Sequence, residues 1–440
     1  MSFFVNLIGG RQMLVALILF GLTYLGMLFF SRARAYIALG SAALFVLLGI
    51  LPWREIPGAV NWNVILMIAG TMGTVSLFIA SKMPAKMADW LIDKSPNMKW
   101  AVIWLSVFAG VISAFVDNVA TVLMIAPVAI DIAKKLKISP VPSIIAIAIA
   151  SNLQGAATLV GDTTSILLAG EADMNFLDFF FFKPAGAAHG GLGLFWIVQV
   201  AFLAATGFLF LFFRREKQPI HLEERTLVKD YIPTVLLLST IVALILVSFL
   251  PQSIPLPKEI NGIICMAVFL IGVMIYGFRS DMIKIAFKEM DYFTLLLLAG
   301  LFVIIKGITA AGAIDAIGEV FKTVSAGNVF LLYTILVWFS VLISAFVDNI
   351  PYVATMLPVV TLLATKLGVS PYILYFGLLS GATLGGNLTP IGASANIAGL
   401  GILRREGHHV KAKQFMKMSV PYTLTAVLVG YLLVWFCWKP

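Results

Sequence analysis

The sequence predicts an all-α polytopic membrane protein with an inverted-topology repeat that contains two re-entrant helical hairpins and two broken helices. Three observations lead to this fold class. Of the 440 residues, 61% are hydrophobic and 12% are charged. Apolar runs of about 18–24 residues recur along the chain, which is close to the length that a helix needs to cross a bilayer. In addition, one six-residue motif occurs twice, once in each half of the chain.

The duplicated motif is SAFVDN, at residues 113–118 and again, 231 residues later, at 344–349. Further residues match at the same offset, so the motif belongs to a longer internal repeat. These matches are Pro127 with Pro358, Ser139-Pro140 with Ser370-Pro371, Gly155 with Gly386, Thr158 with Thr389 and Gly161 with Gly392. At an offset of 230, Ala69-Gly70 matches Ala299-Gly300.

Both halves are predicted to contain the same kinds of element in the same order. The first half, residues 1–213, has helices near 12–30, 35–52 and 60–80, an amphipathic piece near 84–95, a hairpin at 99–134, a broken helix at 142–169 and a spanning helix at 190–213. A polar cytoplasmic linker covers 214–230. The second half, residues 231–440, has helices near 231–249, 260–277 and 291–308, a hairpin at 328–365, a broken helix at 372–402 and a last helix at 419–438.

The distribution of Lys and Arg predicts the orientation of the chain. With the linker in the cytoplasm, and with each hairpin entering and leaving on one side, the inside segments are 31–34, 82–99, 134–137, 214–229, 278–290 and 404–418. They hold 22 basic residues, against seven in the outside segments. This asymmetry follows the positive-inside rule and requires the two halves to have opposite orientations, which is a common plan of secondary transporters.

Several classes of protein are disfavoured. The two cysteines, Cys265 and Cys437, lie in apolar runs and indicate neither a disulfide framework nor a metal cluster. We interpret the net charge of +9 as the basic bias of cytoplasmic loops, with the lipid bilayer and not nucleic acid as the partner. No nucleotide-binding loop and no nucleophile–base–acid set occurs in the sequence. We therefore expect no enzyme, no organic cofactor and no direct use of ATP by this chain.

The hairpin tips place a carboxylate and an amide at membrane depth, at Asp117-Asn118 and at Asp348-Asn349. A charged side chain costs about 3 kcal/mol or more there and normally faces protein, water or a transported ion. Oxygen-bearing side chains suit hard cations such as sodium, and a proton can compete for the same carboxylate. The alternative interpretation is that Asp and Asn cap the helices of a tight turn. Capping and ion binding are compatible.

The broken stretches combine glycine and hydroxyl residues in the middle of apolar runs. The first extends from Gly155 to Ser165 and the second from Gly385 to Asn396. Unwound backbone is tolerated at membrane depth only where it lines a cavity or is buried in protein. Helix N-termini can then bind an anion, and unwound carbonyl groups can bind a cation. The alternative is a kinked helix that packs through small residues, which does not explain the polar residues.

Asp162 and Lys306, which lie within apolar runs, have no charged counterpart in the other half. Asp162 aligns with Ala393 and would add a third carboxylate to the core. Lys306 aligns with Ser76. It is a possible charge partner for a core carboxylate, or a proton-linked switch. In the alternative interpretation, its long side chain extends to the outer membrane interface.

Three segments together resemble a known family: VDNVATVLMIAP (116–127), VDNIPYVATMLP (347–358) and GGNLTPIGASANIAGLG (385–401). They resemble the ion transporter superfamily, and within it the branch of the arsenite pump membrane subunit, the NhaD-type sodium/proton antiporters and the melanosomal P protein. The resemblance covers nearly the whole chain. The more distant divalent-anion/sodium symporters have Ser-Asn-Thr at the hairpin tips, where this chain has Val-Asp-Asn.

The resemblance implies a scaffold domain, a transport domain that moves in an elevator-like alternating-access cycle, and a homodimer formed through the scaffold. By position, it implies a sodium site at Ser113, Asp117, Asn118 and the Gly161 region, and another at Ser344, Asp348, Asn349 and the Gly392 region. The substrate would bind between the tips, near Thr158, Thr163, Asn387, Thr389, Ser394 and Asn396.

The charges of the core discriminate among substrates. Three acidic residues and at most one base favour a small cation, so we expect sodium/proton antiport with sodium or protons as the coupling ion. The alternative is coupled transport of a small anion or a neutral oxyacid of the arsenite class. A dicarboxylate fits less well, because no core arginine is expected to bind its carboxylates.

A channel or a non-transporting membrane enzyme is a third alternative, which two hairpins entering from opposite sides disfavour. Short loops, and a first apolar run without a small-residue cleavage site, predict a retained first helix and an integral protein of a prokaryotic inner (plasma) membrane.

Overall fold

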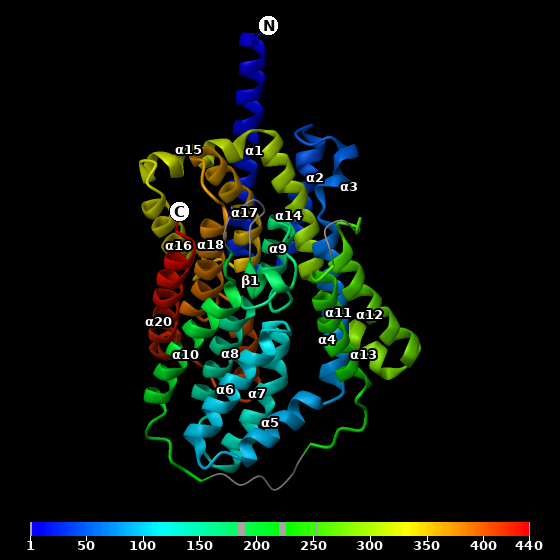
Figure 1. Ribbon diagram of the computed structural model, residues 1–440, viewed down its shortest axis with the longest axis vertical. Coiled ribbons are helices and arrows are strands. Elements are labelled where there is room, and N and C mark those ends of the chain that lie inside the picture. Colours follow the sequence, from blue (N-terminus) through cyan, green and yellow to red (C-terminus); the bar gives the residue numbers. More distant parts are fainter. Residues whose placement is uncertain (1, 183–189, 220–225, 251–253, 440) are drawn as a thin grey trace.

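The computed structural model describes residues 2–182, 190–219, 226–250 and 254–439, and this part of the chain is almost entirely helical (Figure 1). The first half contains α1 (Ser2–Phe29), α2 (Arg34–Leu47), α3 (Ile56–Ala59), α4 (Trp62–Ala80), α5 (Met83–Asp93), α6 (Met98–Ser113), α7 (Asn118–Lys135), α8 (Val141–Gly155), α9 (Thr163–Ala172) and α10 (Leu194–Phe212).

The second half contains α11 (Ile232–Ser248), α12 (Ile260–Tyr276), α13 (Asp281–Glu289), α14 (Tyr292–Ala310), α15 (Ala313–Ser325), α16 (Val329–Ser344), α17 (Asn349–Leu367), α18 (Tyr372–Gly385), α19 (Ser394–Arg405) and α20 (Ala412–Trp438). Single 3-10 turns lie at η1 (Ser31–Ala33), η2 (Trp53–Glu55), η3 (Leu177–Phe179) and η4 (Gly386–Leu388). Strands β1 (Phe181–Phe182) and β2 (Gly191–Leu192) pair antiparallel.

Several of these helices can cross a bilayer. By length and hydropathy, six described helices qualify: α1 over residues 11–29, α4, α10, α14, α17 and α20. Helices α15 and α16, bent by 115° at a short break, would make a seventh span if they are taken together. The predicted class, an all-helical polytopic membrane protein with broken helices, is therefore confirmed.

The two halves of the repeat exchange helices. Helix α2 of the first half packs against α14 of the second, and α12 of the second half packs against α4 of the first. The glycines of the duplicated Ala-Gly pair lie at these two crossings. A Cβ atom at Gly70 would lie 2.3 Å from the backbone of Cys265, and one at Gly300 would lie 2.9 Å from the backbone of Ala38. Only glycine permits such close approach of two helix backbones.

The two hairpins enter from opposite ends of the molecule. Helices α6 and α7 form the first hairpin beside α5, at the end where the chain continues into the linker, of which residues 220–225 lie outside the described part (Figure 1). Helices α16 and α17 form the second hairpin beside α15, at the other end (Figure 1). Both hairpins turn at the duplicated motif, so the two motifs face each other in the interior.

The innermost helices are α8 and α18, which precede the breaks. Every residue of α8 except Pro142 is buried, and every residue of α18 after Tyr372 is buried. A helix that is apolar on all sides belongs at the centre of a bundle. Helix α8 ends at Gly155 and helix α18 ends at Gly385, and the chain becomes α-helical again at Thr163 and at Ser394. The two breaks therefore lie in the interior, beside the hairpin tips.

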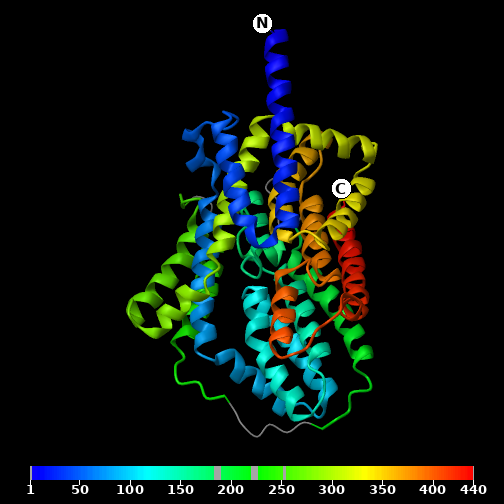
Figure 2. The ribbon, with the colours of Figure 1, turned by 180° about the vertical axis from the view of Figure 1, so that it is seen from behind.

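The first two helices differ from the sequence prediction. Helix α2 has 14 residues, which corresponds to about 21 Å and is shorter than a bilayer core of about 30 Å. In Figure 2, α1 descends only to about mid-height of the body, and α2 returns toward the end from which α1 came. The assignment of residues 31–34 to a cytoplasmic segment is therefore wrong: this turn lies at about mid-height of the molecule, and Arg34 at its end contacts Asp348 of the second hairpin.

Candidate ion-binding site

Both hairpin tips are helix N-termini capped by the aspartate of the motif. The carboxylate of Asp117 accepts hydrogen bonds from the backbone N–H groups of Val119 and Ala120, at 3.0 and 3.1 Å. The carboxylate of Asp348 accepts one from the N–H of Ile350, at 3.0 Å. The structural interpretation of these aspartates as caps is thus correct for both tips. Because a carboxylate has about four acceptor positions, each cap retains capacity for an ion.

Each hairpin is attached to the broken helix of its own half by a matched pair of contacts. The hydroxyl of Thr158 donates to the carbonyl oxygen of Ala114, and the hydroxyl of Thr389 donates to that of Ala345. Glycines follow three residues later at both places. A Cβ at Gly161 or at Gly392 would lie 2.8 Å from the same carbonyl oxygens. The repeated Thr-x-x-Gly spacing therefore brings each break against its hairpin turn.

Buried oxygen atoms gather where each break meets its tip. The hydroxyl groups of Ser113 and Ser344 are buried without a hydrogen-bond partner among the described residues. Carbonyl oxygens of the hairpin turn and of the break surround Gly161 and Gly392 at these positions. A set of hydroxyl, amide and carbonyl oxygens suits a hard cation. Among the described residues, no group of three or more His, Cys, Asp or Glu side chains is placed so that it could hold a metal ion.

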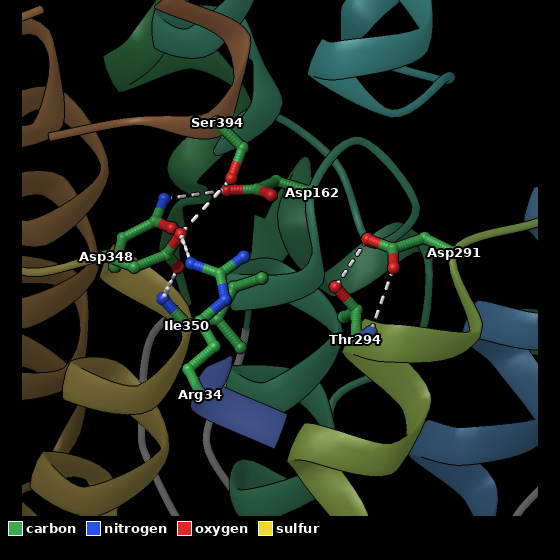
Figure 3. A network of polar contacts seen from close by, with 8 residues as sticks. Arg34, Asp162, Asp291, Thr294, Asp348, Ile350 and Ser394 are labelled. Atoms are coloured by element: carbon green, nitrogen blue, oxygen red, sulfur yellow. Dashed lines mark hydrogen bonds and ion pairs between the residues drawn. The ribbon is translucent and has the colours of Figure 1, made fainter. Parts of the chain in front are cut away.

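Asp162 connects the first break to the second hairpin. Its carboxylate accepts a hydrogen bond from the hydroxyl of Thr164 at 2.8 Å and one from the side-chain amide of Asn349 at 3.3 Å. Figure 3 shows Asp162 pointing toward Asp348 and Ser394. The structure thus brings the carboxylate found only in the first half to the motif of the second half.

A cavity of about 110 Å³ lies between the two tips and is markedly acidic. Its ionisable side chains are Asp117, Asp162, Glu289 and Asp291. The amides of Asn118 and Asn349 and the hydroxyls of Ser76, Thr163, Thr294 and Ser394 also contribute to the wall. Its remaining walls come from apolar residues of α4 and α7 and from Ile350. No Lys or Arg lines it among the described residues. Glu289 was not predicted as a site residue because it lies in the segment 278–290, which the sequence assigns to the cytoplasm, and Asp291 was not predicted because it is the first residue of the expected helix at 291–308.

Asn152 is a third residue that the sequence reasoning missed. It is fully buried at the end of α8, where it accepts a hydrogen bond from Asn118 at 2.9 Å and donates to the carbonyl oxygen of Thr383 at 2.8 Å. Asn387 makes the reciprocal contact, with its amide donating to the carbonyl oxygen of Ile149 at 2.9 Å. The available signal was an amide side chain at the end of an apolar run, with Gln154 two residues later. These bonds join the two halves at the centre of the bundle.

The remaining predicted residues of the second half divide into two groups. The hydroxyl of Ser394 donates to the carboxylate of Asp348 at 3.1 Å, so Ser394 belongs to the tip. The amide of Asn396 donates to the carbonyl oxygens of Gly386 and Thr389, both at 3.1 Å. Asn396 therefore holds the shape of the break, and its side-chain oxygen is buried without a partner among the described residues.

The expectation that the core lacks an arginine is wrong. Nη1 of Arg34 lies 2.5 Å from the carboxylate of Asp348, and both side chains are largely buried, with 17% and 11% exposed. Figure 3 shows the guanidinium pointing from the start of α2 to the second hairpin tip. Sequence reasoning missed this contact because Arg34 ends an apolar run in the manner of a cytoplasmic flank.

Lys306 lies away from the aspartates. Its side chain is exposed on α14 and lines a different cavity of about 190 Å³, together with Glu171 and Asn61. None of the ion pairs found among the described residues involves Lys306. The structure therefore does not pair Lys306 with a core carboxylate.

Comparisons with known proteins agree with this architecture. A transporter of Mycobacterium tuberculosis named as uncharacterized is 29% identical over 415 residues, which cover 92% of this chain and 94% of the relative. The human P protein is 28% identical over 480 residues, covering 90% of this chain and 56% of that longer protein. The resemblance to the branch that includes the melanosomal P protein is thereby confirmed.

Two solved transporters share the fold. The YdaH transporter of Alcanivorax borkumensis, described as having an unusual topology, has a TM-score of 0.59 at 17% identity and covers 89% of this chain and 87% of its own. MtrF of Neisseria gonorrhoeae, described within a class of antimetabolite efflux pumps, has a TM-score of 0.55 at 15% identity and covers 87% and 82%.

The family assignment comes from the sequence profile of the citrate transporters, which matches residues 15–381 of this chain. That range includes both hairpins and most of α18. The profile and the names of the relatives indicate a membrane transporter and not an enzyme. The chain is an integral membrane protein that belongs to the citrate transporter family, CitMHS, within the ion transporter superfamily.

Proposed function

We propose that this secondary transporter exchanges sodium ions for protons at the first hairpin tip. The observation that carries the proposal is the cavity between the tips, with four carboxylates in or beside its wall and no basic residue among the described ones. Such a wall attracts cations and repels anions. A cation that binds there replaces water as the partner of the carboxylates.

The chemistry of exchange requires one carboxylate that binds either a proton or a sodium ion. Asp117 and Asp162 both line the cavity, and neither makes an ion pair with a basic residue of the described chain. Carboxylates held close together out of bulk water do not all remain charged without a counter-ion, so a proton leaves when sodium arrives and returns when sodium departs. That competition alone couples the two ions.

The proposed movement is elevator-like. The hairpins α6–α7 and α16–α17 and the broken helices α8–α9 and α18–α19 contact one another and would move as a transport domain. Helices α4 and α12, and α2 and α14, which pack across the two halves, would belong to the scaffold. As sequence-based proposals we retain a homodimer through the scaffold and a prokaryotic inner membrane.

One observation favours a second candidate function. The family that matches this chain is described as citrate transporters. In addition, the guanidinium of Arg34 lies beside the second hairpin tip. A guanidinium binds carboxylates with two parallel hydrogen bonds. Coupled uptake of a carboxylate, or of a small oxyacid such as arsenite, is therefore the alternative to be measured beside antiport.

Proteoliposomes that contain purified protein and a trapped pH dye test the proposal. With the membrane potential clamped, an imposed sodium gradient should drive proton movement in the wild type, and the Asp117→Asn and Asp162→Asn variants should lose it. Asp281→Asn is a matched control, because this aspartate is 91% exposed at the start of α13. Sodium gradients that move no protons through folded wild-type protein would exclude antiport. Radiolabelled citrate and arsenite, tested in the same vesicles, measure the alternative.

A further inference from the structure

The two hairpin tips have the same sequence but different partners. In both, the motif aspartate caps the following helix and the threonine of the break holds the preceding turn. The carboxylate of Asp348, however, is in contact with Arg34 at 2.5 Å. None of the ion pairs among the described residues involves Asp117. The two tips therefore have the same local structure, but only the second has a positively charged side chain beside its motif aspartate.

The guanidinium comes from outside the hairpins. Arg34 begins α2, and the neighbouring α1 also reaches the second hairpin, where the hydroxyl of Tyr24 donates to the carbonyl oxygen of Pro351 at 2.6 Å. The corresponding connection of the second half, between α11 and α12, contains the basic residue Lys258, whose side chain is exposed. The inverted repeat is thus asymmetric at the contact between Arg34 and Asp348.

Among the hydrogen bonds and ion pairs of the described residues, the guanidinium of Arg34 has Asp348 as its partner. Nε of Arg34 is buried without a hydrogen-bond partner among the described residues, so no other carboxylate or carbonyl group competes for that side of the group. Arginine stays charged at any physiological pH. The guanidinium already neutralises the charge of the Asp348 carboxylate. A sodium ion at the same place would be repelled by the positive charge of the guanidinium.

We propose that Arg34 is a tethered cation: its guanidinium takes, at Asp348, the place that an exchangeable cation takes at the first tip, so that each protomer exchanges its cation only at the Asp117 tip. The inference rests on the proposed cation exchange. In this assignment Arg34 is a positioning residue that holds the second tip neutral. Asp348 itself carries no transported ion.

Equilibrium binding of radioactive sodium to purified protein tests the assignment. Because each hairpin tip whose motif aspartate lacks a basic partner should hold about one cation, the wild type should bind about one sodium ion per protomer and Arg34→Gln about two. The double variant Arg34→Gln/Asp348→Asn should return to the wild-type number, since it replaces an ionic pair by a neutral one. Arg34→Lys keeps the charge and should also bind the wild-type number. A purely structural role of the pair would leave the number of bound ions the same in all four proteins.

Two results would overturn the assignment. One is an unchanged sodium stoichiometry in folded Arg34→Gln. The other is a double variant that loses sodium-dependent proton movement as completely as Asp117→Asn, because Asp348 would then carry a transported ion.

A wild type that binds no sodium would refute the proposed function instead. In that case the pair is tested by thermal unfolding, without sodium, of the wild type, Arg34→Gln, Asp348→Asn and the double variant. The effect of Asp348→Asn on Tm should shrink in the Arg34→Gln background, and additive shifts in Tm would overturn the assignment of Arg34 as the counter-charge of Asp348.

Discussion

The side-chain amide of Asn152 donates a hydrogen bond to the carbonyl oxygen of Thr383 at 2.8 Å, and so joins the end of α8 to α18 in the other half of the repeat. Asn118 at the first hairpin tip donates to the same asparagine. The first tip, the first broken helix and the second broken helix therefore form one hydrogen-bonded unit. In the proposed elevator-like movement, such a unit would move as one body and keep its binding site unchanged.

Replacing Asn152 should destabilise this unit. Asn152→Ala leaves the amide of Asn118 and the carbonyl group of Thr383 without their buried partner, which we expect to lower the free energy of unfolding by about 2–4 kcal/mol. Asn97→Ala is the control, because Asn97 caps α6 through a single bond to the N–H of Trp100 and its loss costs about 1 kcal/mol. Denaturant unfolding in detergent measures both. Equal losses would show that the central bonds contribute nothing beyond an ordinary cap.

The two glycines of the breaks should not tolerate a side chain. A Cβ at Gly161 would lie 2.6 Å from the carbonyl oxygen of Gly155, and one at Gly392 would lie 2.6 Å from that of Gly386. We expect Gly161→Ala and Gly392→Ala to separate the break from the hairpin and to abolish transport. Gly207→Ala, in α10 with open space around it, should be neutral or stabilising by about 1 kcal/mol. Transport by either break variant at the rate of Gly207→Ala would contradict the close packing described above.

The threonine contacts predict a symmetric effect on both hairpins. Thr158→Val and Thr389→Val remove the hydroxyl groups that donate to Ala114 and Ala345 while preserving the volume of the side chain. Each should lower the free energy of unfolding by about 1–3 kcal/mol, because a buried carbonyl group loses its donor. Thr158→Ser and Thr389→Ser keep the hydroxyl and should recover most of this loss. Equal free energies of unfolding for the serine and valine variants would show that the hydroxyl hydrogen bond does not stabilise the attachment of the hairpin to the break.

Competition between the ions predicts the dependence of transport on pH. When sodium and a proton bind the same carboxylate, a tenfold rise in proton concentration should raise the apparent KM for sodium by up to about tenfold, with little change in the maximal rate. Initial rates at several sodium concentrations and pH values, with the potential clamped, provide the measurement. A KM that stays constant while the maximal rate falls would indicate separate proton and sodium sites.

Lys306 should be dispensable for the exchange itself. Its side chain is exposed beside Glu171 in a cavity that contains none of the three aspartates. We expect Lys306→Met to keep sodium-driven proton movement within about twofold of the wild type, since exposed charges away from a site contribute little to it. A loss as large as that of Asp117→Asn, in folded protein, would show that Lys306 reaches the site in another state of the cycle.

The sequence by itself determined the elements and their local chemistry. Apolar run lengths identify membrane helices, and a repeated SAFVDN string with Thr-x-x-Gly following the next helix identifies two equivalent hairpins and breaks. These are properties of neighbouring residues: a capped turn, a glycine that permits close approach, a helix length. Hence the positions of Asp117, Asp348, Gly161 and Gly392 at the tips and breaks follow from the order of residues alone.

Tertiary structure decided which distant groups meet. Arg34 and Asp348 are separated by 314 positions, and their contact exists only because α2 packs against α14 and its first residue stops beside the second hairpin. Nothing in the residues around Arg34 distinguishes this turn, at mid-height of the molecule, from a cytoplasmic flank, because in both cases basic residues follow an apolar run. The same holds for Asp291, a polar residue before α14 that lines the cavity. The charge balance of the site, and with it the choice of substrate, is thus a property of the packing.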